Sequence, residues 1–92
     1  MKKKRHIPVI SFNELELKQN KPQVYRSLVE GIAEAIKNKS DEINLCEIKY
    51  ANTYLTVHKD VWSGSLAKAM DFYIENEQYE VCGKIKNLIL KI

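Results

Sequence analysis

Residues 66–92 read LAKAMDFYIENEQYEVCGKIKNLILKI, and this stretch decides the fold that the sequence predicts. Apolar residues recur at three- and four-residue steps on either side of the polar run 75–78, a pattern typical of two short amphipathic helices joined by a tight turn. Gly83 is placed to bring the two helices together. The pair has more apolar positions than two helices can bury between themselves, so it must pack on the rest of the chain, on a second copy or on a partner. The apolar positions are Leu66, Ala69, Met70, Tyr73, Ile74, Tyr79, Cys82, Ile85, Leu88, Ile89 and Ile92.

A longer helix is predicted upstream, from about residue 21 to residue 40. Pro22 suits the first turn, where its missing N–H leaves no hydrogen bond unmade. Lys37 and Lys39 place positive charges at the negative end of the helix dipole. One apolar stripe runs along this helix. Its members are Val24, Tyr25, Leu28, Ile32, Ala35 and Ile36.

Residues 43–50 and 53–58 are predicted strands, because they alternate apolar with polar side chains or are rich in β-branched and aromatic residues. Ala51-Asn52 is predicted as a two-residue turn between them. A two-stranded hairpin alone is barely stable in water, so it needs a helix, an arm or another subunit across its apolar face. The helical pair is expected to begin near Asp60, a plausible N-cap, or after Ser63-Gly64-Ser65.

Residues 1–20 are predicted to form a basic, extended arm, and residues 21–92 a single domain. Pro8 restricts any strand in the arm to the edge of a sheet. The arm either lies on the domain or docks on another protein. Its apolar residues are Ile7, Val9, Ile10, Phe12, Leu15 and Leu17. The predicted fold class is therefore α+β and mostly helical, with an arm, one helix, a β-hairpin and an antiparallel helical hairpin over residues 60–92.

Length and composition indicate one small globular domain. A chain of 92 residues buries roughly 60% of the surface that it exposes when unfolded, so oligomerisation would be an ordinary source of extra stability. No run approaches the roughly 18 apolar residues of a membrane span, and the start of the chain does not match a secretion signal. We therefore expect a cytoplasmic protein with no membrane partner, in which Cys46 and Cys82 are free thiols.

The positive charge is concentrated at the N-terminus. The net charge is +3 and Lys2, Lys3, Lys4 and Arg5 supply +4, so the remaining residues sum to −1. These four residues, with Lys18 and Lys21, could contact phosphates without sequence specificity. Only two of the fifteen basic residues are Arg. This argues weakly against a protein that recognises nucleic acid, because the Arg side chain is better suited than Lys to binding phosphates and bases.

Residues that could carry catalysis are scattered and do not form a motif. His58 has no second His or Cys at metal-ligand spacing, and Ser63-Gly64-Ser65 lacks the Gly-x-Ser-x-Gly setting of a nucleophile. Glu75, Glu77 and Glu80 gather at the helical turn, where a solvated loop is the simplest interpretation. Both cysteines lie on apolar stripes. We expect no enzymatic activity, no cofactor and no metal.

The helical pair resembles the UVR motif, a helical hairpin of bacterial excision-repair subunits and of some protease-regulating proteins. The resemblance covers residues 66–89 and rests on a first helix with Leu66 and Met70, then Asn76, then a second helix opened by an aromatic-Glu pair. That second helix carries Tyr79, Glu80, Cys82, Gly83, Ile85 and Ile89. The sequence departs from the motif at Lys86-Asn87, where the family has Arg-Asp. The resemblance implies protein–protein association and does not imply repair chemistry.

The leading hypothesis is a non-enzymatic protein–protein interaction module, which associates with itself or with a partner through the helical pair. Its size and composition resemble those of a small phage or mobile-element accessory protein. One alternative is a small nucleic-acid-binding regulator that uses Lys2, Lys3, Lys4 and Arg5, and another is a virion structural component. The expected partner-binding residues are Met70, Tyr73, Tyr79, Ile85, Ile89 and Trp62, since Trp and Tyr are enriched at binding hot spots.

Overall fold

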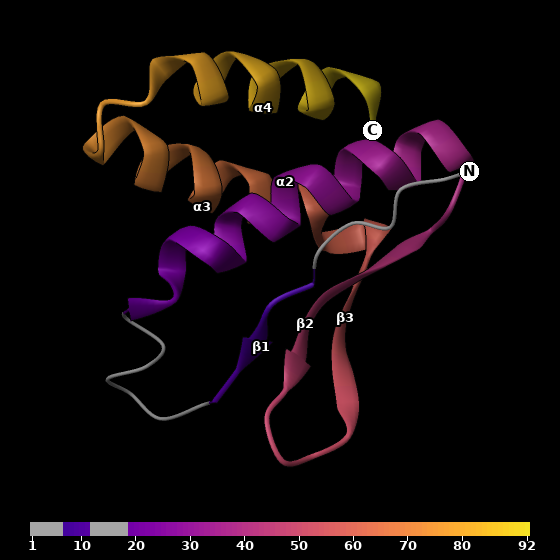
Figure 1. Cartoon of the computed structure of the whole chain (residues 1–92). Helices are drawn as coiled ribbons and strands as arrows, with labels where there is room; N and C mark the ends of the chain where they lie inside the picture. The colour runs from indigo at the N-terminus through magenta and orange to yellow at the C-terminus, as the bar shows by residue number, and fades with distance from the viewer. Residues whose placement is uncertain (1–6, 12–18) are drawn as a thin grey trace, which may run out of the picture.

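The computed structural model describes residues 7–11 and 19–92, which form an α+β fold with a helical pair at its C-terminal end (Figure 1). The fold class predicted from the sequence is confirmed. Within the described residues, three strands form one sheet in the order β1-β2-β3. The elements are β1 (Val9–Ile10), α2 (Lys21–Asn38), β2 (Glu42–Ile48), β3 (Thr53–His58), the 3-10 turn η1 (Lys59–Val61), α3 (Trp62–Glu75) and α4 (Tyr79–Lys91).

Helix α2 agrees closely with the helix that the sequence predicts. Pro22 lies in its first turn, where a missing N–H is tolerated. Lys39 directly follows the last residue of the helix and adopts the left-handed conformation with φ 57°. The Lys39 N–H then donates to the Ile36 carbonyl at 3.3 Å and the Ser40 N–H donates to the Ala35 carbonyl at 2.8 Å. This pair of bonds is a Schellman ending, which satisfies carbonyls that the last turn would leave unpaired.

Part of the predicted arm lies on the sheet as its parallel edge strand, β1. The Glu47 N–H donates to the Pro8 carbonyl and the Lys49 N–H donates to the Ile10 carbonyl, both at 2.9 Å. Pro8 thus contributes only its carbonyl to the sheet, as a proline at a strand edge can. Phe12, Leu15 and Leu17, the other apolar residues of the arm after β1, lie outside the described residues.

The β2–β3 hairpin differs from the prediction in its turn and its register. Ile48 pairs with Thr53, so the turn contains four residues, 49–52, instead of Ala51-Asn52 alone. Tyr50 and Asn52 both have positive φ, at 67° and 54°. Asn tolerates this conformation, so Asn52 suits the predicted turn, whereas Tyr rarely adopts it and Tyr50 was not predicted to belong to the turn. A register shift between Asn44 and Cys46 leaves one extra residue in β2, as in a β-bulge.

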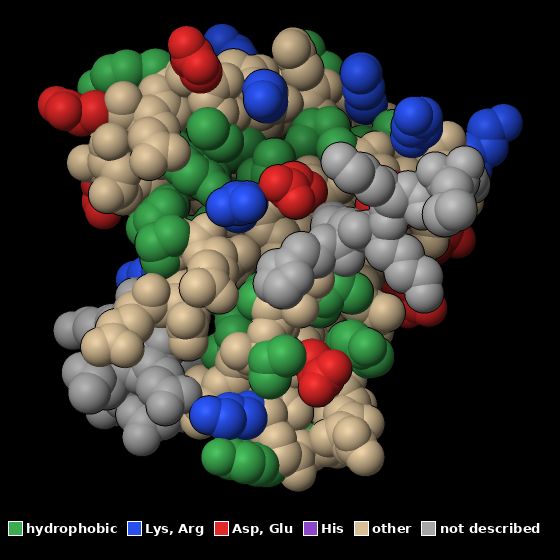
Figure 2. Space-filling model, viewed as in Figure 1, with side chains coloured by type: hydrophobic (Ala, Val, Ile, Leu, Met, Phe, Trp, Pro, Cys, Tyr) green, Lys and Arg blue, Asp and Glu red, His purple; other side chains and the backbone are tan. Residues whose placement is uncertain are grey.

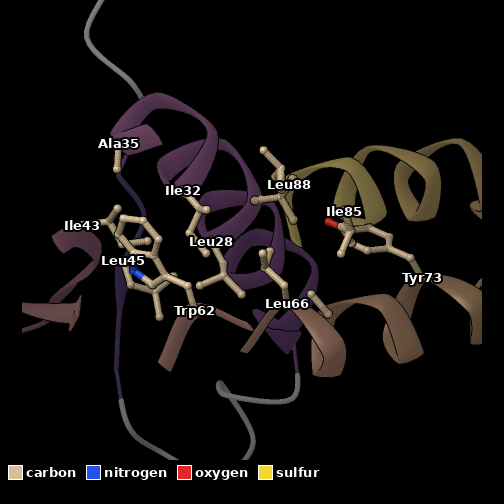
Figure 3. Packing of buried hydrophobic residues seen from close by; sticks show 12 residues of the cluster. Leu28, Ile32, Ala35, Ile43, Leu45, Trp62, Leu66, Tyr73, Ile85 and Leu88 are labelled. Atoms are coloured by element: carbon tan, nitrogen blue, oxygen red, sulfur yellow. The ribbon is translucent and has the colours of Figure 1, made fainter. Parts of the chain in front are cut away.

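Helix α2 joins the sheet to the helical pair and forms the centre of the core. It packs on β2 and contacts both α3 and α4, and Figure 3 shows its Leu28 and Ile32 between Leu45 of the sheet and Leu66 of α3. The apolar faces of the helical pair are therefore buried against the rest of the same chain, which is one of the three possibilities that the sequence allows. The buried cluster contains Leu28, Val29, Ile32, Ala35, Ile43, Leu45, Trp62, Leu66, Ala69, Tyr73, Ile85 and Leu88.

The turn between α3 and α4 is fixed by backbone hydrogen bonds. Glu77 has φ 59°, its N–H donates to the Ile74 carbonyl at 3.0 Å, and the Gln78 N–H donates to the Tyr73 carbonyl at 2.8 Å. Asn76 adds a bond from Nδ2 to the Phe72 carbonyl at 2.7 Å. This is a second Schellman ending, and it reverses the chain so that α4 returns along α3 (Figure 1).

The helical pair begins close to Asp60, the first of the two starts that the sequence allows, but Asp60 is not the N-cap of its first helix. Asp60 lies in η1 and not at a helix N-cap; its N–H donates to Nδ1 of His58 at 3.3 Å. Helix α3 then begins at Trp62, so Gly64 lies inside the helix and not in a preceding loop.

Gly83 does not bring the two helices together, as the sequence suggested, because it is exposed and a Cβ added there would meet nothing within 4 Å. We expect Gly83→Ala to raise the free energy of unfolding by about 0.5–1 kcal/mol, since glycine is a poor helix former. Urea denaturation should show a higher midpoint with an unchanged slope. A lower midpoint would mean that Gly83 makes a close contact after all.

Candidate functional site

Three of the predicted partner-binding residues belong to the protein's own core. Ile85 has 0% of its surface exposed, Trp62 has 3% and Tyr73 has 6%. Figure 3 shows Ile85 directed toward the α3 side with Tyr73 beside it, and Trp62 beside Leu45. These side chains are enclosed because α2 packs its apolar stripe on the same face of the helical pair. In this conformation Trp62 and Ile85 are therefore enclosed by the chain itself, whereas the small exposed part of Tyr73 lines the groove between α2 and α4.

Trp62 serves as a structural anchor between the sheet and the helices. Its Nε1–H donates to the Val57 carbonyl at 3.0 Å, which ties the first residue of α3 to strand β3. A buried indole usually finds such a partner for its N–H. The bond fixes where α3 leaves the sheet and hence where the helical pair meets α2.

The other three predicted residues lie closer to the surface. Met70 and Ile89 are half-buried and pack against the core cluster. Tyr79, at the start of α4, has 63% of its surface exposed. Leu90 is 80% exposed and was missed, because it falls outside the apolar stripe of its helix. Helix α4 thus carries large apolar side chains both inside the core and on the outside.

A groove of about 560 Å³ runs between α2 and α4. In Figure 2, hydrophobic side chains gather in the hollow between α4 at the top and α2 below it, with charged side chains around them. The apolar floor consists of Val29, Ala33, Tyr73, Val81 and Leu88, and the polar rim of Arg26, Glu30, Gln78, Lys84, Asn87 and Lys91. An apolar floor with a polar rim is the usual composition of a protein-binding groove.

The rim of the groove carries a net positive charge. Three cationic side chains and one anionic side chain line it, which gives +2. Arg26 Nε lies 3.4 Å from Glu30 Oε1 along one face of α2, so these two charges partly offset each other. Because of this offset, Lys84 and Lys91, both exposed on α4, contribute most of the positive electrostatic potential at the groove. This arrangement favours a ligand with carboxylates along its edges.

Tyr73 gives the floor of the groove its one phenol. Burial raises the pKa of its hydroxyl, and the nearby Glu30 carboxylate acts in the same direction, although Arg26 opposes the shift. The neutral phenol is therefore the form present at physiological pH.

The cysteines have the packing roles that their positions on apolar stripes predict. Cys46 is a buried free thiol whose pKa is raised by burial, which disfavours the reactive thiolate. The Cys82 thiol donates to the Met70 carbonyl at 3.8 Å and links α4 to α3. Among residues 7–11 and 19–92, no group of His, Cys, Asp and Glu side chains is arranged to hold a metal ion.

The residues of the nucleic-acid hypothesis are mostly outside the described part of the chain. Lys2, Lys3, Lys4, Arg5 and Lys18 all lie there, and Lys21 is exposed at the start of α2. None of the helices that the structure describes has the length and apolar character needed to cross a bilayer.

The groove could not be found from the periodicity of one helix alone. Its floor uses Val29 and Ala33, which lie one position beyond the predicted stripe of α2 at Leu28 and Ile32. An apolar pair four residues apart beside a stripe is a weak signal that the buried face extends further. The contribution of Val81 and Lys84 depends on how α4 docks on α2, which no local pattern reveals.

In comparisons with known proteins, no family model matched the chain, and neither the curated proteins nor the solved structures contained a match. The resemblance of residues 66–89 to the UVR motif stays a prediction from the sequence.

Proposed function

We propose that this protein is a non-enzymatic protein–protein interaction module, and that the groove between α2 and α4 receives an amphipathic helix with acidic residues along its flanks. The observation that supports this proposal is the combination of an apolar floor with a rim of net charge +2. Helix α4 supplies half of the groove, which keeps the helical pair at the centre of the function predicted from the sequence.

A helix fits this groove better than an extended peptide does. The walls are themselves helices, so the floor offers apolar side chains at helical spacing: Val29 and Ala33 lie about one turn apart on α2, and Val81 and Leu88 about two turns apart on α4. A bound helix presents apolar residues at three- and four-residue steps and would cover them. Its acidic flanks would meet Lys84 and Lys91, which steers association and fixes orientation.

The expected compartment is the cytoplasm. Cys46 and Cys82 are both free thiols, as is usual for proteins of a reducing compartment. The partner in this proposal is accordingly another cytoplasmic protein.

The test uses peptides selected from a displayed library of amphipathic helices, about 15 residues long, with Glu or Asp on their flanks. We expect selected peptides to lose at least roughly tenfold in affinity for the Ala33→Arg variant, because a long side chain then fills the floor. Lys84→Glu should weaken binding by roughly three- to tenfold, because it repels the acidic flank. Isothermal titration calorimetry at low protein concentration measures both effects.

The matched control is Lys86→Glu, which makes the same charge change two residues away on α4 but outside the groove. Affinity for this variant should stay within about twofold of the wild type. If the library yields no peptide, or if binding is indifferent to Ala33→Arg, the proposal fails. Salt-dependent binding of an oligonucleotide that is lost on deletion of residues 1–5 would instead favour the nucleic-acid alternative.

A further inference from the structure

The groove between α2 and α4 has two ends that differ in charge. Both helices run in the same direction along it, from left to right in Figure 1, so their first turns lie at one end and their last turns at the other. Arg26 and Gln78 line the groove near the start of the two helices, and Lys91 lines it at the end of α4. A bound helix can lie along the groove in either direction, and the charges of the two walls decide between them.

The charge changes sign along the α4 wall. At about 100° per residue, four exposed residues of this helix fall within a sector of about 60°; in chain order they are Glu80, Lys84, Asn87 and Lys91. Glu80 precedes Lys84 by one turn, so these two charges partly offset each other. Lys91, in the last turn, is left as the main charge of this wall. Lys86 lies on the opposite side of the helix.

The α2 wall has the same order of charges. Four exposed or half-buried residues fall within a sector of about 60°; in chain order they are Arg26, Glu30, Ala33 and Lys37. Arg26 and Glu30 form an ion pair at 3.4 Å and largely cancel. Lys37 continues the wall one turn beyond Ala33, in the last turn of the helix. The main charge of this wall therefore lies at the same end of the groove as Lys91.

Further acidic residues surround the first end of the groove. Glu75 and Glu77, both exposed at the turn between α3 and α4, add to the charge of Glu80. Figure 2 shows acidic side chains around this turn at the upper left and basic side chains at the upper right, where α2 and α4 end. The groove is therefore acidic where its two helices begin and basic where they end.

The neighbours of the basic end do not reverse its charge. Glu34 lies to one side of the α2 wall and lines a pocket toward β2, so it offsets Lys37 only in part. Another pocket beyond this end contains two further lysines and two aspartates, which balance each other. They are Lys39, Lys59, Asp41 and Asp60.

We propose, on the basis of the helix-binding function above, that the bound helix runs antiparallel to α2 and α4. Its first two turns carry Glu or Asp and lie between Lys37 and Lys91, and its last turn carries Lys or Arg and lies beside Glu30 and Glu80. A parallel helix of the same sequence would bring its acidic turns to Glu80, so like charges oppose it. The helix dipoles agree, because the positive end of the bound helix meets the negative ends of α2 and α4.

The length of the groove lets one ligand sense both ends. Glu80 and Lys91 are about 16 Å apart along the axis of α4, and a helix of about 15 residues spans about 22 Å. The partner is thus narrowed from any acidic amphipathic helix to one that is acidic at its start and basic at its end.

The test uses two versions of one selected peptide, with the same apolar residues and the same numbers of Glu and Lys. One has Glu in its first two turns and Lys in its last turn, and the other has these positions exchanged. By isothermal titration calorimetry, the wild type should bind the acidic-first peptide at least roughly tenfold more tightly.

An acidic start also favours the helix of the free peptide, so the protein must be changed as well. The variant with both Glu80→Lys and Lys91→Glu reverses the α4 wall at two exposed positions. Its preference for the acidic-first peptide should fall below about threefold. Lys86→Glu, on the opposite side of α4, is the matched control and should keep the wild-type preference. A preference unchanged in the double variant would overturn the proposed direction.

The direction can also be observed by NMR with a nitroxide label on the acidic-first peptide. A label at the peptide N-terminus should broaden the amide signals of Lys37 and Lys91, and a label at its C-terminus those of Arg26 and Val81. The reverse pattern, or equal broadening at both ends, would overturn the proposal. Equal wild-type affinity for both peptides, lost in Ala33→Arg, would overturn the direction and leave helix binding standing, whereas no binding of either peptide would overturn both.

Discussion

Replacing Ile85 by Ala is expected to lower the free energy of unfolding by about 2–5 kcal/mol. Ile85 is fully buried and belongs to the core cluster in which α4 meets α2 and α3. The substitution removes apolar surface from the core and leaves a cavity that close-packed neighbours fill only in part. A domain of this length is stable by roughly 5–14 kcal/mol, so the change removes a large share of the total. Urea denaturation followed by circular dichroism measures it.

The control for this prediction is Leu90→Ala, five residues further along the same helix. Leu90 is 80% exposed, so its truncation should change the free energy of unfolding by no more than about 0.5 kcal/mol at low protein concentration. Equal losses from the two substitutions would contradict the assignment of Ile85 to the core and Leu90 to the surface.

Trp62→Ala is expected to destabilise the fold by about 3–5 kcal/mol. Trp62 is buried in the core cluster beside Leu45, and its Nε1–H donates to the Val57 carbonyl at 3.0 Å. The substitution removes the largest side chain of the junction between β3 and α3, and it removes the hydrogen bond as well. Thermal unfolding monitored by circular dichroism should show a much lower midpoint.

Two further variants separate packing from hydrogen bonding at this position. Trp62→Phe keeps an aromatic ring but loses the N–H donor and some volume, so it should cost about 1–3 kcal/mol. Val61→Ala changes the neighbouring residue, whose side chain is largely exposed, and should cost less than about 1 kcal/mol. A Trp62→Phe variant as stable as the wild type would show that neither the bond nor the lost volume contributes to stability.

Local patterns predict most of the secondary structure in this chain. The three- and four-residue spacing places α2, α3 and α4 within a few residues of their observed bounds, and the β-branched run 53–58 coincides with β3. These elements are predictable because each depends on its own periodicity and turn residues. The Schellman endings at Lys39 and Glu77 are harder to foresee, since both use a non-glycine residue with positive φ.

The periodicity of apolar residues does not show whether an apolar face packs on the same chain or on a partner. Tyr73 and Ile85 lie on stripes that would serve equally well for a partner or for the chain itself, and only the position of α2 decides the outcome. The sequence identifies the helical pair correctly, and the structure places three of the predicted partner-binding residues, Trp62, Tyr73 and Ile85, among the buried side chains of the core. The groove arises from the docking of α2 on α4, so Ala33 gives only a weak signal in the pattern of its own helix and Lys84 gives none.

We propose above that the groove between α2 and α4 binds an acidic amphipathic helix. The most direct test is heteronuclear NMR of the isotope-labelled protein during titration with a selected peptide. We expect the largest chemical-shift changes on backbone amides of the groove, at Ala33, Val81, Lys84 and Asn87, with little change along β3. Shift changes centred on the sheet, with the amides of the groove unmoved, would contradict it.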